Sequence, residues 1–320
     1  MTRVAAVDCG TNSIRLLISE ARSPKEIKDV TRTMEIVRLG QGVDATGEFA
    51  PEALQRVEKA LRSFVDQMKF EHVERVRMVA TSASRDAKNS DEFFSMTARL
   101  LGEVQPGACA EVISGEEEAQ LSFRGAVSDL SADKGPFCVI DLGGGSTEFI
   151  VGTAAGSILG AHSAQMGCVR ITERILHSDP PLEGELRDAE EFVAKQLEQV
   201  EAKVPVAEAS TFVGCAGTFT TLSALAQGLE KYDPRYIHGS TLRFDALRVL
   251  TAQIKRETFE TRAQNPVIHP GRADVLAGGA VSVEGIMDLI SRNSAQRSFY
   301  ISEKDILDGT VAGIVDELYA

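Results

Sequence analysis

A repeated strand–loop–strand pattern constrains this chain more than any other feature of its sequence. The segment DCGTNSIR, residues 8–15, aligns without gaps on DLGGGSTE, residues 141–148. Each copy follows a four-residue apolar stretch that predicts a strand, and each runs into another apolar stretch. Two ordinary hairpin turns would also be rich in Asp, Gly and Asn, but they would not need the same loop twice. The repeat therefore predicts two similar lobes that face each other.

The residue types of the repeat suit phosphate and a metal ion. Glycine lets backbone N–H groups approach phosphate oxygens closely, because no Cβ stands in the way. Ser, Thr and Asn add hydrogen bonds, and carboxylates can hold a divalent cation. The copies differ at their last position, where Arg15 is a phosphate-pairing cation and Glu148 is a metal-type ligand. Unless both are plain exposed strand residues, we expect one lobe to grip phosphate and the other to hold the metal.

The rest of the chain alternates predicted strands and helices, which is typical of an α/β protein. Apolar periodicity predicts strands over 76–80, 111–113, 137–140 and 299–301, and another that begins at Phe212. It predicts helices that begin at Pro51, near Ser90 and after 114–118, and others over about 183–203, 243–258, 274–291 and 308–319. A polar break at 128–136 predicts domains 1–128 and 129–320, with the option that the last helix packs back on the first domain.

Composition excludes several classes of protein. The 320 residues carry a net charge of −13 without a dense Lys/Arg run, which argues against a nucleic-acid partner. No apolar run could cross a bilayer, and the first residues do not resemble a signal peptide, so we expect a cytoplasmic protein without a membrane partner. The five cysteines lack any CxxC pair and predict neither disulfides nor zinc. Cys9, Cys138 and Cys215 are expected to be buried thiols.

Two further segments could carry chemistry. VGCAGT, residues 213–218, ends a predicted strand and opens a helix, whose first N–H groups could bind an anion. SGEEE, residues 114–118, places Ser114 three residues before Glu117, which predicts a capping box. Glu116 and Glu118 then remain as candidates for a base that orients or deprotonates an attacking water. The residues alone do not choose between these two carboxylates.

Three arginines stand beside turns, and each is either a phosphate ligand or an ordinary surface residue. Arg85 follows a Ser/Thr-rich segment, Arg170 follows MGCV, and Arg272 follows Pro-Gly. The five histidines show no metal-ligand spacing, and no Ser-His-Asp or Cys-His arrangement is visible. A polyanionic substrate would therefore depend on a local group of arginines and a cation, against an acidic background.

Six motifs, in this order, resemble the exopolyphosphatase / guanosine pentaphosphate phosphohydrolase family of the actin-like superfamily. They are DCGTNSIR at 8–15, TSASRDA at 81–87, ISGEEEA at 113–119, DLGGGSTE at 141–148, MGCV at 166–169 and GCAGT at 214–218. The resemblance covers essentially the whole chain and is closest to the short form, which lacks the C-terminal helical domains of longer members. It implies two actin-like (ribonuclease H-like) α/β domains with the active site in a central cleft.

The resemblance also assigns roles to residues. It implies that Glu118 is the catalytic carboxylate that activates water, and that Asp141 and Glu148 bind Mg²⁺, with Mn²⁺ as an alternative. The implied phosphate contacts are Asn12, Ser13, Arg15, Arg85, Gly144, Gly145, Ser146, Gly217, Thr218 and, less firmly, Arg272. In one segment the chain departs from the family pattern. Residues 302–309 read SEKDILDG, where members often carry SDGxLREG. The family Arg is absent and Lys304 replaces the turn Gly, so any role of this loop in substrate length is open.

The resemblance implies release of terminal orthophosphate from inorganic polyphosphate. Hydrolysis of guanosine pentaphosphate shares the same parts, and the lack of extra domains favours polyphosphate. An actin-like kinase or ATPase is a further alternative, although a kinase would not need Glu118 to activate water. The altered loop keeps open a non-catalytic sensor of polyphosphate or an alarmone. Because many actin-like proteins pair, a homodimer is also expected.

Overall fold

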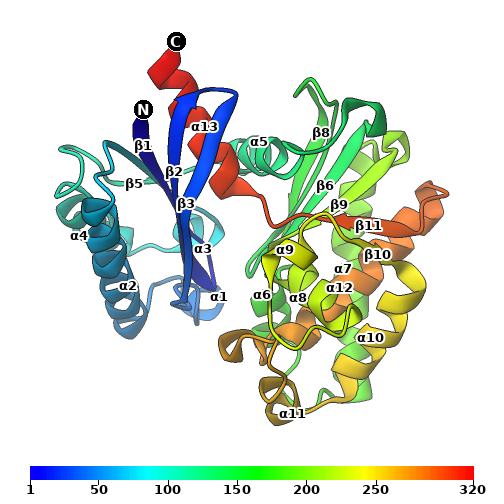
Figure 1. Cartoon of the computed structure of the whole chain (residues 1–320). Helices are drawn as coiled ribbons and strands as arrows, with labels where there is room; N and C mark the ends of the chain where they lie inside the picture. The colour runs from blue at the N-terminus through cyan, green and yellow to red at the C-terminus, as the bar shows by residue number, and fades with distance from the viewer. The chain divides into compact units, whose positions relative to one another are not determined.

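The chain divides into two compact units in a computed structural model that describes residues 1–320, apart from the side chain of Asp86. The first unit comprises residues 1–125 and 306–320, and the second comprises 126–305 (Figure 1). We expected the first domain to span 1–128. The first unit ends at Gly125 and also contains the last helix, α13 (Ile306–Tyr319).

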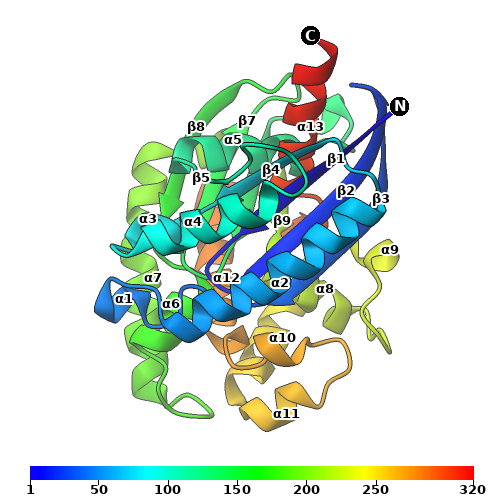
Figure 2. The same cartoon turned by 90° about the vertical axis from the view of Figure 1, so that its left-hand side faces the viewer.

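The first unit is built on a five-stranded sheet. Its strands are β1 (Thr2–Cys9), β2 (Ser13–Ser23), β3 (Glu26–Ile36), β4 (Arg75–Ala80) and β5 (Ala110–Val112), in the order β3-β2-β1-β4-β5. The pairs β1–β2 and β2–β3 are antiparallel, whereas β1–β4 and β4–β5 are parallel. The helices are α1 (Val43–Thr46), α2 (Pro51–Phe70), α3 (Ser82–Asp86), α4 (Ser90–Leu101), α5 (Gly115–Ala126) and α13. Figure 2 shows α2 lying along one face of this sheet.

Strand β1 explains why the last helix belongs to this unit. Ala5 and Val7 lie in one apolar cluster with the buried side chains of α2 and α4. Val4 and Ala6, which point to the opposite face, cluster with Val311 and its neighbours on α13. A strand that is buried on both faces reads as a continuous apolar run rather than an alternating one. The sequence VAAV at 4–7 is such a run.

The second unit repeats this sheet and adds one strand. Its strands are β6 (Phe137–Leu142), β7 (Thr147–Gly152), β8 (Ile158–Ala164), β9 (Thr211–Cys215), β10 (Thr241–Arg243) and β11 (Ser298–Ile301), in the order β10-β11-β9-β6-β7-β8. The antiparallel strands β6–β7–β8 match β1–β2–β3, and the parallel strands β9 and β11 match β4 and β5. The duplicated α/β architecture predicted from the repeat is confirmed.

The helices of the second unit pack mainly around α12. They are α6 (Cys168–Arg174), α7 (Glu183–Lys203), α8 (Ala216–Ala226), α9 (Pro234–Ile237), α10 (Phe244–Arg256), α11 (Phe259–Ala263) and α12 (Leu276–Asn293), with short 3₁₀ turns at 132–134, 206–208 and 270–272. Most side chains of α12 are buried, and α7 and α10 contact it directly. The long helices predicted from apolar spacing are all present.

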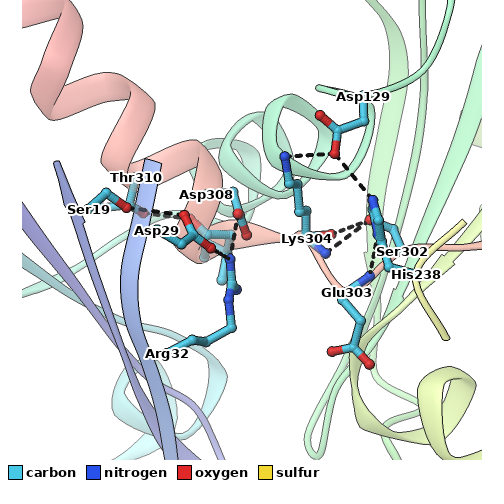
Figure 3. A network of polar contacts seen from close by, with 11 residues as sticks. Ser19, Asp29, Arg32, Asp129, His238, Ser302, Glu303, Lys304, Asp308 and Thr310 are labelled. Carbon is cyan, nitrogen blue, oxygen red and sulfur yellow. Dashed lines mark hydrogen bonds and ion pairs between the residues drawn. The ribbon is translucent and has the colours of Figure 1, made fainter. Parts of the chain in front are cut away.

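Polar contacts hold the start of the segment 302–309, which departs from the family pattern, and Figure 3 draws them. Lys304 Nζ pairs with Asp129 Oδ2 at 2.7 Å, and His238 Nε2 lies 3.2 Å from the same oxygen. The backbone N–H of Glu303 donates to His238 Nδ1 at 3.2 Å. Asp129 and Lys304 stand close to the two points where the chain passes between the units. The ion pair therefore joins these two connecting segments on the side of the second unit.

The cysteines are as expected from their apolar surroundings. All five are free, with Cys109 exposed and the other four buried. The prediction that Cys9, Cys138 and Cys215 are buried thiols is confirmed. Burial raises the pKa of the Cys138 thiol to about 12, which makes it unreactive near neutral pH. No helix in the described chain is both long and apolar enough to cross a membrane.

Two glycines of α13 provide a matched test of how this helix packs in the first unit. A Cβ at Gly309 would lie 2.0 Å from the carbonyl oxygen of Leu121 on α5, whereas a Cβ at Gly313 would meet nothing within 4 Å. Gly309→Ala should lower stability by about 1–3 kcal/mol, because backbone atoms of α5 must move. Gly313→Ala should raise it by about 0.5–1 kcal/mol through helix propensity. Thermal unfolding of the two variants checks this, and equal midpoints would contradict the packing described.

Candidate active site

In the first unit, three segments that carry predicted site residues meet at one edge of the sheet. Strands β1, β4 and β5 are parallel, so their carboxyl ends share this edge. The N–H of Thr81 donates to Cys9 O at 3.3 Å, and the N–H of Ile113 donates to Ala80 O at 3.2 Å. The loop after β1, the segment 81–85 and the start of α5 are therefore neighbours. In open α/β sheets, ligands bind outside the carboxyl ends of the strands.

The two repeated loops share one turn. Gly10 N–H donates to Ser13 O at 3.0 Å, and Gly143 N–H donates to Ser146 O at 3.0 Å. In the second loop, the carbonyl oxygens of the three glycines are held by the amides that open α6. The bonds run from Cys168 N to Gly143 O (3.1 Å), from Val169 N and Arg170 N to Gly144 O (2.9 and 3.1 Å), and from Gly167 N to Gly145 O (3.2 Å).

These bonds decide where the loop's own amides point. In a planar trans peptide, the C=O group and the following N–H group point in opposite directions. Because the carbonyls of residues 143–145 point toward α6, the N–H groups of Gly144, Gly145 and Ser146 point away from it. Three successive amides turned to one side form a concave anion site. Arg170 strengthens the arrangement by donating from Nε to Gly145 O at 2.8 Å, which is a structural role.

The first loop uses the same device. Gly40 N–H donates to Thr11 O at 2.9 Å, and Val37 and Arg38 donate to Asn12 O at 3.0 and 2.8 Å. By the same peptide geometry, the N–H groups of Asn12 and Ser13 point away from the segment 37–40. The two lobes thus present their loop amides in the same way.

A glycine beneath each loop makes these bonds possible, and sequence reasoning missed this correspondence. A Cβ at Gly40 would lie 2.3 Å from Thr11 Cγ2, and a Cβ at Gly167 would lie 2.3 Å from backbone atoms of Gly144. Each glycine follows a large apolar residue, Leu39 or Met166, shortly after the third strand of its sheet. That apolar–Gly pair was the available signal, but it is too short to recognise without the aligned strands.

The two lobes differ in the cross-strand pair beside the loop. Asp8 lies directly opposite Arg15, which donates to Asp8 Oδ2 from Nη2 at 2.7 Å and from Nε at 3.0 Å. A phosphate bound by Arg15 would therefore share this guanidinium with Asp8. The matching residues in the second unit, Asp141 and Glu148, are also directly opposite each other and are 8% and 3% exposed. Like charges in this position repel, so a bound cation would stabilise the second pair.

The acid pair fits a magnesium-type site. Glu148 Oε1 accepts a hydrogen bond from Ser163 Oγ at 2.8 Å, which orients the carboxylate. Mg²⁺ is usually held by one or two carboxylates, together with waters and substrate phosphates. Among the residues that the structure describes, no group of three or more His, Cys, Asp or Glu side chains could hold a metal. An ion on Asp141 and Glu148 would thus complete its shell with water and phosphate oxygens.

The structure distinguishes the two carboxylates that the residues alone left open. Glu118 is 7% exposed, and Arg85 Nη1 donates to its Oε2 at 2.8 Å and to Ile113 O at 2.9 Å. Glu116 is exposed. Glu118 is thus a buried carboxylate held by an arginine at the strand ends, whereas Glu116 is solvated.

Glu117 has a structural role, as the predicted cap suggested. Its backbone N–H donates to Ser114 Oγ at 3.1 Å, which is one half of a capping box. Its carboxylate accepts a hydrogen bond from Arg77 at 2.6 Å. This contact ties the start of α5 to β4 and so fixes the turn that carries Glu118.

In the second unit, the start of α8 and Arg272 lie against each other. A Cβ at Gly217 would lie 2.0 Å from Arg272 Nη1, so the guanidinium rests on the backbone of Gly217. Thr218 is buried beside Cys168. Burial raises the pKa of the Cys168 thiol to about 11, although the positive charge of Arg272 and a hydrogen bond from Thr218 both lower it. A helix N-terminus and a guanidinium both favour an anion. The backbone N–H of Cys168 also donates to Gly143 O in the second repeated loop.

The predicted site residues thus fall into two groups, one in each unit. The first unit brings together Asn12, Ser13, Arg15, Arg85 and Glu118 at the ends of β1, β4 and β5. The second unit brings together Asp141, Gly144, Gly145, Ser146, Glu148, Gly217, Thr218 and Arg272 at the ends of β6 and β9. Each group can supply phosphate ligands, one has a carboxylate suited to a base, and the other has a carboxylate pair suited to a metal.

Comparisons with known proteins show what the chain resembles along nearly its whole length. A model of the Ppx/GppA phosphatase family matches residues 17–312. Exopolyphosphatase 2 of Mycobacterium tuberculosis is 51% identical over 312 residues, which cover 97% of each chain. The crystal structure of an exopolyphosphatase-like protein is 38% identical, with a TM-score of 0.92 over 99% of this chain and 100% of that chain. A Ppx/GppA family member from Aquifex aeolicus is 28% identical, with a TM-score of 0.80 over 100% and 99% of the two chains.

The fold is also shared more widely. A nucleoside triphosphate hydrolase from Neospora caninum is only 12% identical, yet it aligns with a TM-score of 0.52 over 99% of this chain and 93% of that chain. This similarity concerns the fold alone, and it agrees with the predicted two-domain actin-like class. With the family match over nearly the whole chain and the 51% identical relative, we conclude that the chain belongs to the Ppx/GppA phosphatase family.

Proposed function

We propose that this protein is an exopolyphosphatase that releases terminal orthophosphate from inorganic polyphosphate and requires Mg²⁺ or Mn²⁺. The observation that carries the proposal is the pair of matching loops, each of which turns successive amides to one side. Support for the substrate comes from the relative named exopolyphosphatase 2, which is 51% identical along nearly its whole length. Five free cysteines fit a reducing compartment, so we place the enzyme in the cytoplasm.

Substrate binding would rely on donors to phosphate oxygens. The amides of Gly144, Gly145 and Ser146 would bind one phosphoryl group, and Asn12 and Ser13 would add donors from the first unit. The start of α8 and Arg272 would take a neighbouring phosphate of the chain. Polyphosphate offers only phosphate oxygens, so repeated amide donors and guanidinium groups suffice to recognise it.

The metal would be held by Asp141 and Glu148. When bound, it would offset negative charge on the phosphoryl oxygens during transfer. Arg15 and Arg85 would contribute further positive charge from the first unit. Since phosphoryl transfer depends mainly on positioning and on stabilising charge, these parts account for most of the chemistry that the reaction needs.

Glu118 would orient the attacking water and accept its proton. The water oxygen attacks the terminal phosphorus, the bridging P–O bond breaks, and the shortened chain leaves with the bridging oxygen. Arg85 holds the Glu118 carboxylate at 2.8 Å, which favours one orientation of the base. This carboxylate also favours a hydrolase over a sensor, because simple binding of polyphosphate would not need it.

Replacement of the base should abolish most of the activity. We expect Glu118→Gln to lower the rate of phosphate release from polyphosphate by about 10²–10⁴-fold, because the amide cannot accept the proton. Glu116→Gln is the matched control, since Glu116 is on the same turn but is exposed. Malachite-green detection of phosphate measures both. Near-full activity of a folded Glu118→Gln protein would refute the assignment.

Removal of the metal should have a reversible effect. Chelation with EDTA should stop phosphate release, and added Mg²⁺ should restore it. Glu148→Gln should raise the Mg²⁺ concentration for half-maximal activity by at least about 10-fold, because one carboxylate of the pair is lost. Glu191→Gln, which changes an exposed acid on α7, should leave it unchanged. If the two variants needed the same Mg²⁺ concentration, the metal site would lie elsewhere.

The orientation of the loop amides can be tested at the glycine beneath them. Gly167→Ala places a Cβ against the backbone of Gly144 and should push the loop off α6. We expect KM for polyphosphate to rise by about 10²-fold, the cost of misplacing binding groups by about 1 Å. Gly184→Ala, where a Cβ would meet nothing within 4 Å, is the control. An unchanged KM in Gly167→Ala would show that these amides do not bind phosphate.

A further inference from the structure

The second unit contains a buried arginine that the proposed reaction does not use. Arg262 lies on α11 and is 2% exposed. Its Nε donates to Ala273 O at 2.7 Å, and its Nη1 donates to Ile254 O at 3.1 Å and to Glu257 O at 2.5 Å. A buried charge is tolerated only when its donors are satisfied. Here backbone carbonyls satisfy most of them, which suits a role in holding the backbone.

One acidic side chain accompanies this guanidinium. Asp179 Oδ1 lies 3.3 Å from Arg262 Nη2, and the Asp179 carboxylate also accepts from the backbone N–H of Phe259 at 2.7 Å. Burial lowers the pKa of Arg262, and the negative charge of Asp179 acts in the opposite direction. Asp179 thus offsets the charge of the buried guanidinium and binds the first N–H group of α11.

The carbonyl that Arg262 Nε binds belongs to the residue after Arg272. The segment 269–275 is short and irregular, with Arg272 N–H donating to His269 O at 2.8 Å and Val275 N–H donating to Arg272 O at 3.1 Å. The bond from Arg262 to Ala273 O connects this segment to the ends of α10 and α11. It therefore fixes the backbone from which the Arg272 side chain extends.

The Arg272 side chain lies close to the second unit's backbone at its other end. Its guanidinium rests on Gly217, where even a Cβ would come within 2.0 Å of Nη1. A small movement of the 269–275 backbone would shift the guanidinium relative to the start of α8. Two contacts thus set the position of Arg272, the proposed phosphate ligand. Gly217 contacts its guanidinium, and Arg262 binds the backbone at the next residue, Ala273.

We infer that Arg262 is a positioning residue that acts on phosphate binding through Arg272, an inference that rests on the proposed function of the site. The competing explanation is that Arg262 only caps the C-terminal carbonyls of α10 and so stabilises the unit. Both explanations predict a lower unfolding temperature when Arg262 is changed. Only the positioning role predicts that the effect on binding disappears once Arg272 is removed.

A double-mutant cycle separates these explanations. Arg262→Lys keeps the charge but loses the planar fork, and Arg272→Met removes the phosphate ligand. We expect Arg262→Lys to raise KM for polyphosphate between about 10- and 100-fold, with a smaller change in kcat. In the Arg272→Met background, the same change should leave KM unaltered while still lowering the unfolding temperature. Asp179→Asn should lower the unfolding temperature with KM unchanged, because the bond to Ala273 remains.

Two results would overturn the inference. One is an equal fold-change in KM from Arg262→Lys with and without Arg272. The other is a rise in KM from Asp179→Asn as large as that from Arg262→Lys at a matched loss of unfolding temperature. Arg262→Gln replaces Arg262→Lys in the cycle if the lysine variant does not fold. If the wild-type protein releases no phosphate, the proposed function fails. The same double-mutant cycle can then be measured with the Kd for tripolyphosphate, determined by calorimetry, in place of KM.

Discussion

The hydrogen bonds that the carbonyls of residues 143–145 accept from the amides opening α6 are the constraint on which the site depends. A trans peptide cannot turn its C=O group toward α6 without turning the next N–H group away from it. The direction of the loop amides, which we propose as phosphate donors, is thus a consequence of how the loop is anchored. Gly167 permits the anchor, because any Cβ there would overlap the backbone of Gly144. The first lobe repeats the arrangement with the segment 37–40 and Gly40.

The chain contains two such loops, and they differ in charge at one position, Arg15 in the first and Glu148 in the second. In the first lobe, Arg15 neutralises Asp8 across the strands. In the second lobe, the matching residue is Glu148, so two buried carboxylates face each other. The first pair joins opposite charges, whereas the second places two like charges opposite each other, an arrangement that a divalent cation would stabilise. The lobe with the acid pair also has the longer run of loop amides, which fits a metal and a phosphate bound side by side.

The sequence predicted the features that depend on local pattern. The repeated loops, the strand at 4–7 and the long helices follow from apolar periodicity and turn chemistry, and all were observed. Strand β3 and strand β8 were missed, because both lie at sheet edges, are only partly buried and lack an apolar alternation. The choice between Glu116 and Glu118 was open from the residues alone because it depends on which side of α5 is covered by β4 and the segment 81–85. Only the family resemblance favoured Glu118 beforehand.

Other site features depend on strand register and on packing between elements. Arg15 was expected to grip phosphate, and its bond to Asp8 becomes visible only once the register of β1 and β2 is known. Arg262 lies in a largely polar stretch of sequence, yet it is buried and its Nε donates to Ala273 O. A lone arginine gives no sign in sequence that its partners will be the backbone carbonyls of Ile254, Glu257 and Ala273. These contacts are set by tertiary packing, which no local pattern encodes.

The most direct test of the proposed substrate is phosphate release from long-chain polyphosphate with Mg²⁺, measured beside guanosine pentaphosphate and ATP at equal concentrations of terminal phosphate. A site built from amides, guanidinium groups and a metal recognises phosphate oxygens and needs no base or sugar. We therefore predict that polyphosphate has the highest kcat/KM of the three. If polyphosphate were inert while guanosine pentaphosphate or ATP turned over, the family and fold would stand, but the proposed substrate would be wrong.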